Sequence, residues 1–260
     1  DYPDYTHLET KTAVTETGEI RAVANTHVTL TTTPTKEIEM ARLVLNNGAD
    51  LGEPQLVEGS LQWQFDLKLG MNGHWKIELT DADGFTNQPP TYPLEVLPDK
   101  SPSVIVTQPV ERELRLRPTE QLPVISEIIE DFGFKDAAFV ITPIGADRPE
   151  EIPIELPTAT RIAETYVSNA TLNLSKITVN GNQRRLGVQV MVRDSRPESY
   201  DGPGEGLSEP FFITLDVNAK TLAQQAVEAK KKAVEEQLRK AKQDLENCLL
   251  YTSPSPRDAS

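Results

Sequence analysis

Short stretches in the first half of the chain alternate between apolar and polar residues. The clearest one covers residues 61–69, in which every odd-numbered position is apolar and every even-numbered position is polar. This period of two residues is typical of a β-strand with one buried face. The apolar face consists of Leu61, Trp63, Phe65, Leu67 and Leu69. Further strands are predicted at residues 28–31, 41–45, 75–79 and 92–96.

Turn-forming residues separate these stretches. Asn-Asn-Gly follows the strand predicted at 41–45, and Asp-Gly at 83–84 and Pro-Pro at 89–90 lie between later strands. Asn and Gly adopt positive φ readily and Pro fixes its own φ, so these residues favour turns. No apolar period of 3.6 residues occurs before residue 219. We therefore predict a sandwich of two antiparallel sheets.

The second part of the chain repeats this plan. Residues 41–45 with Gly-Ala-Asp at 48–50 correspond to residues 137–141 with Gly-Ala-Asp at 145–147, an offset of 96 or 97 residues. One immunoglobulin-like sandwich has about 100 residues, so we interpret the correspondence as an internal duplication, with chance similarity as the alternative. Two further pairs occur in the same order, 75–79 with 186–192 and 92–97 with 211–217.

These patterns predict a mainly β fold, with two tandem immunoglobulin-like β-sandwiches followed by one long α-helix. The first sandwich is expected at residues 1–98 and the second at 99–217. Residues 98–102 read Pro-Asp-Lys-Ser-Pro, and two prolines in five positions suit a short, stiff linker between them.

The helix is predicted over residues 218–247. Residues 219–247 contain no Gly or Pro and are rich in strong helix formers, and Asn218 is a suitable N-cap. Apolar residues recur with a heptad spacing, which Lys231 interrupts, and this indicates the start of a coiled coil. The heptad positions are Val227, Val234 and Ala241, and Leu238 and Leu245.

Composition excludes several classes of function. The 260 residues carry a formal charge of −14, whereas sequence-independent nucleic-acid binders need a basic face. The longest apolar runs fall far short of the roughly 18 residues that a membrane span requires. One cysteine makes neither a disulfide framework nor a thiolate metal cage. The chain also begins at Asp1 without a methionine or a signal peptide, so we expect it to be an acidic fragment of a longer protein.

The C-terminal residues 248–260 have a different character. Cys248 to Asp258 resembles the translation of a transposase-type sequencing adapter over eleven residues. The alternative is a natural, disordered tail rich in Ser and Pro. We expect this segment to be an artefact and disordered, in which case Cys248 carries no information about redox environment.

Acidic residues raise the question of calcium at two places. Asp81, Asp83 and Asn87 fail the EF-hand pattern, because Gly occupies the fourth position of the loop and Phe85 the fifth, so a tight hairpin turn is expected instead. Cadherin-like calcium binding between the two sandwiches, through Asp99, Asp131 or Asp194, is the second possibility. It requires several carboxylates to converge at the linker, which the sequence does not reveal, and we assign no metal site and no cofactor.

No residue pattern points to catalysis, so we assign no catalytic residue and expect no enzyme. The histidines, His7, His27 and His74, lack the spacing of a zinc site and are expected at the surface. A Ser-His-Asp triad is not excluded by spacing, but no nucleophile-elbow or phosphate-loop motif occurs. Trp63 and Trp75 are expected to fill the first core rather than bind a ligand.

Several short motifs resemble one bacterial family. They are Tyr-Pro-Asp-Tyr-Thr at 2–6 with Gly-Glu-Ile at 18–20, the Asp-x-x-Gly turn at 81–84, Leu-Pro-Asp at 97–99, and Glu-Asp-Phe-Gly at 130–133. The chain resembles uncharacterised membrane-anchored envelope proteins with tandem immunoglobulin-like modules and a long coiled-coil tail. It departs from them at Glu130, where the family has Asp. The resemblance implies a periplasmic location on the inner membrane and no particular activity.

We therefore expect a non-catalytic structural or interaction segment of a cell-envelope protein, acting as an extracytoplasmic stalk or a protein-binding scaffold. The alternative is a carbohydrate- or peptidoglycan-binding accessory module. The expected partners are proteins, including a second copy through the helix. We expect no nucleic acid, and contact with the membrane only through segments missing from this fragment.

Overall fold

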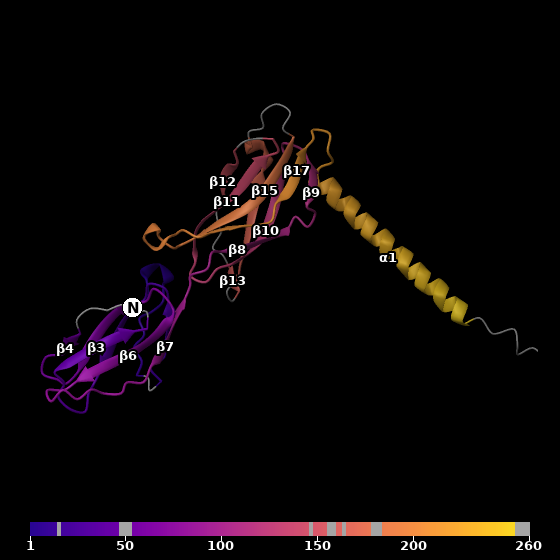
Figure 1. The fold of residues 1–260 in the computed structure, drawn as a ribbon. Helices are drawn as coiled ribbons and strands as arrows, with labels where there is room; N and C mark the ends of the chain where they lie inside the picture. The colour runs from indigo at the N-terminus through magenta and orange to yellow at the C-terminus, as the bar shows by residue number, and fades with distance from the viewer. Residues whose placement is uncertain are drawn as a thin grey trace, which may run out of the picture.

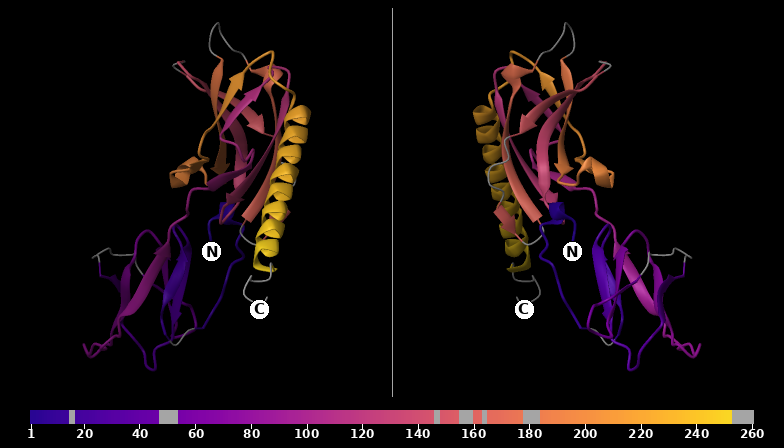
Figure 2. Two further views of the ribbon diagram at one scale, coloured as in Figure 1. Left: turned by 90° about the vertical axis from the view of Figure 1, so that its right-hand side faces the viewer. Right: turned by 90° about the vertical axis from the view of Figure 1, so that its left-hand side faces the viewer.

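The computed structural model shows two β-sandwiches that lie end to end and one long helix (Figure 1). It describes residues 1–14, 17–46, 54–145, 148–154, 160–162, 165–177 and 184–252. Residues 47–50 and 146–147, which belong to the repeated Gly-Ala-Asp motifs and to the turn expected after residue 45, lie outside the described residues. The helix begins at the end of the second sandwich that faces away from the first, diverges from that sandwich (Figure 1) and slants back toward the level of the first (Figure 2).

The first sandwich consists of two sheets, one of four strands in the order β1-β7-β6-β3 and one of three in the order β2-β5-β4. Strand β1 is parallel to β7, and the other pairs are antiparallel. The strands are β1 (Ile20–Val23), β2 (His27–Thr32), β3 (Met40–Leu45), β4 (Gln55–Leu56), β5 (Trp63–Lys68), β6 (Gly73–Thr80) and β7 (Tyr92–Leu97). The 3₁₀ turn η1 (Asp4–Thr6) precedes them.

The second sandwich has the same plan with additional strands. One sheet has the order β13-β14-β10-β8, and the other β12-β11-β15-β17-β9 with β16 paired to β15. The strands are β8 (Ser103–Gln108), β9 (Glu113–Leu116), β10 (Gln121–Ile129), β11 (Phe134–Pro143), β12 (Glu150–Ile154), β13 (Thr160–Ile162), β14 (Thr165–Asn173), β15 (Arg185–Asp194), β16 (Glu205–Leu207) and β17 (Phe211–Leu215). Two further 3₁₀ turns are η2 (Leu174–Lys176) and η3 (Glu198–Tyr200).

Strand order identifies both units as immunoglobulin-like sandwiches. In the second one, β8, β10, β14 and β13 form one sheet, and β11, β15 and β17 form the centre of the other. These seven strands correspond to the two sheets of the seven-stranded immunoglobulin fold, and β12 and β9 extend the second sheet at its edges. The three repeated sequence pairs occupy equivalent places, because β3, β6 and β7 are arranged as β11, β15 and β17 are. The predicted fold class is thus confirmed.

Each sandwich buries its own hydrophobic core. Phe65, Leu67 and Leu69 are buried on the predicted face of β5, and Trp75 joins them from the opposite sheet. Leu61 is 45% exposed, contrary to the predicted pattern, because the strand begins only at Trp63. The second core is larger, and its fully buried side chains include Leu116, Ile141, Leu186, Val188, Phe211 and Ile213.

The helix α1 (Leu222–Thr252) begins later than predicted. Asn218 is not its N-cap, because the helix begins only at Leu222, and the amide of Asn218 donates to the Asp216 carboxylate in the preceding turn. Instead, the Thr221 hydroxyl accepts from the amide of Gln224, whose side chain accepts from the amide of Thr221, forming a capping box.

The end of α1 also differs from the predicted one. The helix continues beyond Asn247, so the expectation of disorder from residue 248 is wrong as far as Thr252. No Gly or Pro interrupts residues 248–252, whereas Pro254 disfavours helix at the residue before it. Residues 253–260 lie outside the described part of the chain. Within that part, no helix combines the length and the apolar character needed to cross a bilayer.

Candidate metal site at the junction of the sandwiches

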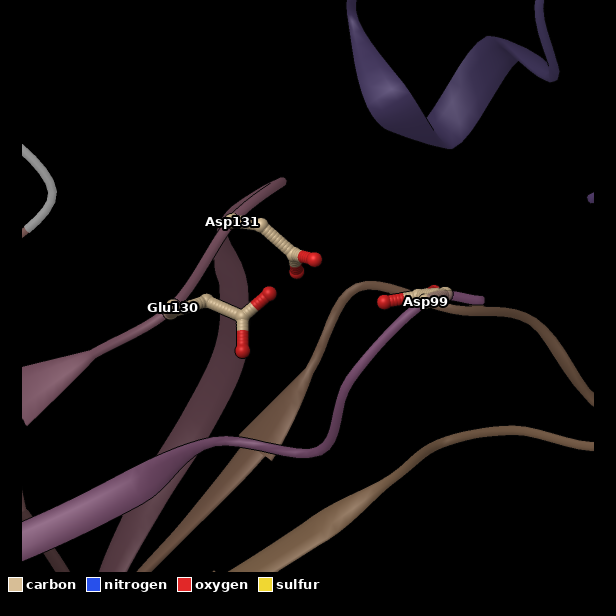
Figure 3. Close-up of side chains that lie close together, drawn as sticks. All are labelled: Asp99, Glu130 and Asp131. Atoms are coloured by element: carbon tan, nitrogen blue, oxygen red, sulfur yellow. The ribbon is translucent and has the colours of Figure 1, made fainter. Parts of the chain in front are cut away.

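Carboxylates from three separate segments converge where the sandwiches meet. Asp99 lies in the linker between β7 and β8, and Glu130 and Asp131 lie in the turn after β10 (Figure 3). This turn can close because Gly133 adopts a φ of +107°, a conformation that side chains disfavour. Asp194 ends β15 and interacts electrostatically with both Asp99 and Glu130. We call these four residues the junction cluster.

The junction cluster is compact and shielded from water. One carboxylate oxygen from each of Asp99, Glu130 and Asp131 lies within 4.8 Å of the others. Glu130 is only 3% exposed and Asp194 only 1%, and the side chain of Asp99 is 5% exposed. Ionised carboxylates this deeply buried require hydrogen bonds or cations as compensation.

Hydrogen bonds compensate only part of the cluster. Asp194 Oδ1 accepts from the amides of Arg196 (3.0 Å) and Gly204 (2.8 Å), and Glu130 Oε1 accepts from the amide of Phe132 (3.1 Å). Five of the remaining six oxygens are buried and have no hydrogen-bond partner of normal geometry among the described residues. These are both oxygens of Asp99, Oε2 of Glu130, Oδ1 of Asp131 and Oδ2 of Asp194.

Arg196 is the one cationic side chain that pairs with these carboxylates in the described part of the chain. Its guanidinium lies 3.8 Å from Asp99 Oδ2 and 3.7 Å from Asp194 Oδ2, and Nη1 donates to the backbone oxygen of Asp99 at 3.2 Å. These ion-pair distances are long for charge-assisted hydrogen bonds. One guanidinium therefore pairs, at marginal distances, with two of the four carboxyl groups.

The electrostatic consequence is a shift of the carboxyl pKa values. Burial raises the pKa of Glu130 to about 8, and the neighbouring carboxylates of Asp131 and Asp194 act in the same direction. Burial also raises the pKa of Asp99, although Tyr5 and Arg196 oppose this. Both shifts mean that the negative charge of the cluster is under-compensated by the protein itself.

Aromatic side chains from both sandwiches cover the junction. The ring of Tyr5, from η1 of the first sandwich, packs edge-on against Phe132 with the ring centroids 6.4 Å apart. It also packs, in a tilted arrangement, against Tyr200 of η3 with the centroids 5.7 Å apart. Lys68, which ends β5, lies over the Tyr200 ring at 5.2 Å. Burial and the Asp99 carboxylate raise the pKa of Tyr5. The cluster thus lies beneath a direct contact between the two sandwiches.

The sequence analysis named Asp99, Asp131 and Asp194 as candidates for calcium binding, and the structure brings all three to the junction. It did not name Glu130 as a ligand. The signal was the Glu-Asp-Phe-Gly motif, which places Glu130 next to Asp131 directly after an apolar run. The sequence contains 40 acidic residues, and only the fold selects these four from them.

The second acidic motif forms the tight turn that was predicted. The amide of Gly84 donates to the carbonyl of Asp81 at 3.0 Å, and Gly84 has a φ of +83°. The Asp81 carboxylate accepts from the amides of Asp83 (3.1 Å) and Phe85 (2.8 Å) and pairs with Lys36. Asn87 points elsewhere, because its side chain bonds the backbone of Ile77 and Leu79.

Asp81 should give the first sandwich an acid-dependent stability. The Lys36 ammonium, together with the amides of Phe85 and Asp83, holds the pKa of Asp81 below its ordinary value of 3.8. This contribution is complete above the unfolded-state pKa and is lost as the pH falls through the lower folded-state pKa. We expect Asp81→Asn to be less stable than the wild type at neutral pH and the difference to shrink in acid. Urea unfolding, followed by tryptophan fluorescence between about pH 7 and pH 2, measures the free energy of unfolding of both proteins. A stability difference that does not change with pH would contradict the prediction.

The remaining candidates stay apart from the junction. His7, His27 and His74 are exposed at separate positions, as expected. Trp75 is buried in the first core, with its indole nitrogen donating to Gly18 at 3.0 Å, and Trp63 packs partly buried against the same core, as predicted. A groove of about 520 Å³ runs along this sandwich, and its lining includes Trp75, Tyr92, Leu30 and Pro89.

Comparison with known proteins finds similarity of structure but no match in sequence. No family model and no curated protein matches the sequence. Solved structures that match include fibronectin(III)-like modules of Clostridium thermocellum CbhA, at 14% identity over 78% of this chain and 90% of that chain, with a TM-score of 0.28. A structure of titin matches at 10% identity over 76% and 94% of the two chains, also with a TM-score of 0.28. The pilin BcpA of Bacillus cereus matches at 9% identity over 73% and 69%, with a TM-score of 0.27.

Proposed function

We propose that this chain is a non-catalytic segment of a bacterial cell-envelope protein, which acts as a stalk or protein-binding scaffold on the periplasmic side of the inner membrane. The observation that carries the proposal is the end-to-end arrangement of two sandwiches, joined by the short linker at residues 98–102 and followed by a projecting helix. This elongated arrangement can hold other parts of the protein apart, and it exposes strand edges and loops that partner proteins can bind. The periplasmic placement rests on the family resemblance, and antibody access in spheroplasts but not in intact cells tests it.

The helix supports self-association within this proposal. Its first turns contact the second sandwich, where Leu222 packs against the core and Gln225 donates to the backbone of Arg115 at 3.0 Å. Its heptad residues beyond that point face solvent: Val227, Val234, Leu238 and Leu245 are 54–67% exposed. An apolar seam with this spacing is buried when a second helix packs against it. We take the occupant to be a second copy of the chain.

We expect the full chain to form dimers or higher oligomers and Leu238→Asp to weaken association at least about tenfold, since it places a charge in the seam. Gln243→Asp introduces the same residue on another face of α1 and serves as the matched control. Light scattering after size exclusion measures both, with reducing agent present because Cys248 is exposed. A wild-type chain that remains monomeric at high concentration, or two variants with equal effects, would contradict self-association through the seam.

The alternative is a carbohydrate- or peptidoglycan-binding accessory module. The groove beside Trp75 and Tyr92 is the observation in its favour, because aromatic faces bind sugar rings. Against it, Trp75 is only 7% exposed and its indole nitrogen is already bonded within the sandwich. Binding of purified peptidoglycan by the full chain, lost in Tyr92→Ala, would favour this alternative.

A further inference from the structure

We propose that a calcium ion binds between Asp99, Glu130 and Asp131 and fastens the linker to the second sandwich. The observation beyond the acidic cluster itself is that Glu130 is almost completely buried and directs an oxygen without a hydrogen-bond partner into the cluster. Asp131 contributes a second such oxygen and Asp99 two more. The inference depends on neither the cellular location nor self-association of the helix.

The spacing of the oxygens suits calcium. Calcium binds oxygen at about 2.3–2.6 Å, so ligands on opposite sides of the ion are separated by roughly 4.6–5.2 Å. Carboxylate oxygens that all lie within 4.8 Å of one another can therefore reach a single calcium ion. Magnesium requires about 2.0–2.1 Å and near-ideal octahedral geometry, which three carboxylates from two segments of the chain match less readily than the flexible geometry of calcium. Zinc favours His and Cys ligands, and the cluster contains neither.

The negative charge of the site also favours a divalent cation such as calcium. Four carboxylates against the single guanidinium of Arg196 leave a net charge of −3 when all are ionised, and a divalent ion reduces this to −1. Asp194 Oδ2 lies 3.7 Å from the Arg196 guanidinium and orients it. Water fills the remaining positions, as is usual for calcium with its six to eight ligands.

The position of the site gives the ion a mechanical role. Asp99 belongs to the linker, whereas Glu130 and Asp131 belong to the second sandwich, so one ion bonded to all three restrains the linker directly. Asp131 precedes Phe132, which packs against Tyr5 of the first sandwich. Bound calcium should therefore reduce the range of angles between the sandwiches.

Titration of the full chain with CaCl₂ in a calorimeter, after removal of metal with a chelator, tests the proposal. We expect one ion per chain with a Kd of about 10⁻⁴–10⁻³ M, the range of extracellular calcium modules, and at least tenfold weaker binding of magnesium. Terbium is a second probe, since Tyr5 lies beside the cluster and should sensitise its luminescence. X-ray scattering of the same samples should show a narrower distribution of dimensions with calcium.

Glu130→Gln is the decisive variant. It prevents the side chain from ionising while the amide oxygen can still accept from Phe132, so we expect a folded chain, checked by circular dichroism, with at least tenfold weaker binding of calcium and terbium. Glu127→Gln removes a charge from the exposed face of β10 and should leave the Kd within about twofold. Absence of heat and of terbium luminescence in the wild type would overturn the proposal, as would equal binding by the wild type and Glu130→Gln. Neither result would bear on the light-scattering test of the helix.

Discussion

Gly206→Ala is expected to destabilise the second sandwich by about 3 kcal/mol, at the upper end of the usual cost of overpacking. Gly206 lies in β16, where it pairs with Val192, and its backbone packs directly on the linker. A Cβ at this position would overlap the carbonyl oxygen of Pro102 and lie 2.7 Å from its carbonyl carbon. No side-chain rotation relieves a clash with backbone, so either β16 or the linker has to move.

Gly187→Ala on the neighbouring strand β15 is the matched control. The nearest atoms to its added Cβ would be the Phe212 ring at 3.5 Å and the carbonyl oxygen of Thr142 at 3.6 Å, which are ordinary contacts. Loss of glycine also lowers the entropy of the unfolded chain, so we expect a change within about 1 kcal/mol. Urea unfolding followed by circular dichroism compares the two variants. Equal stability of both would show that β16 can leave the linker at little cost.

Phe211→Ala is expected to lower the stability of the second sandwich by about 3–5 kcal/mol, because it leaves a cavity in a closely packed core. Phe211 is completely buried and begins β17. The two tryptophans of the chain, Trp63 and Trp75, both lie in the first sandwich. Tryptophan fluorescence therefore reports on the first sandwich, whereas circular dichroism reports on both. We expect the circular-dichroism transition to move to lower urea and the fluorescence transition to move much less.

Phe212→Ala provides the control for this experiment. Phe212 is adjacent in β17 but only half buried, and its ring contacts the Arg185 guanidinium at 4.6 Å. We expect the free energy of unfolding to fall by about 1 kcal/mol, mostly because the cation–π contact is lost. If Phe211→Ala shifted the fluorescence and circular-dichroism transitions equally, the two sandwiches would unfold as one cooperative unit and their independence would be refuted.

The sequence predicted the strands whose two faces differ most. Alternation identified β5, and the repeated apolar runs identified β3, β6 and β7 with their counterparts β11, β15 and β17. Strand β10 was missed partly because it contains Pro123, which normally argues against a strand within a sheet. Pro123 is tolerated because it lies where β10 pairs with β14 alone, the pairing with β8 beginning only at Ile125.

The junction cluster could be predicted only in part, and the reason is physical. Asp99, Asp131 and Asp194 were considered as ligands of a cadherin-like calcium site between the two sandwiches. Their convergence depends on the angle at which the linker enters the second sandwich and on the turn at Gly133. Neither is encoded in the spacing of the residues along the chain. The burial of Glu130 follows from the same turn. Because glutamate is ordinarily exposed, nothing in the sequence marked Glu130 as a buried ligand.

The parallel pairing of the outer strands determines how the chain would respond to tension. In the first sandwich β1 runs parallel to β7 from Ile20↔Leu94 to Val23↔Leu97, and in the second β9 runs parallel to β17 from Glu113↔Phe212 to Leu116↔Leu215. When the two ends of the first sandwich are pulled, its first and last strands, β1 and β7, slide along each other, and the hydrogen bonds between them are loaded together in shear. In the second sandwich β8 precedes β9 and pairs antiparallel with β10, so β8 can peel away one bond at a time before the parallel pair of β9 and β17 is loaded in shear. We therefore expect the first sandwich to extend little before its parallel strand pair separates, and the second to extend in two stages.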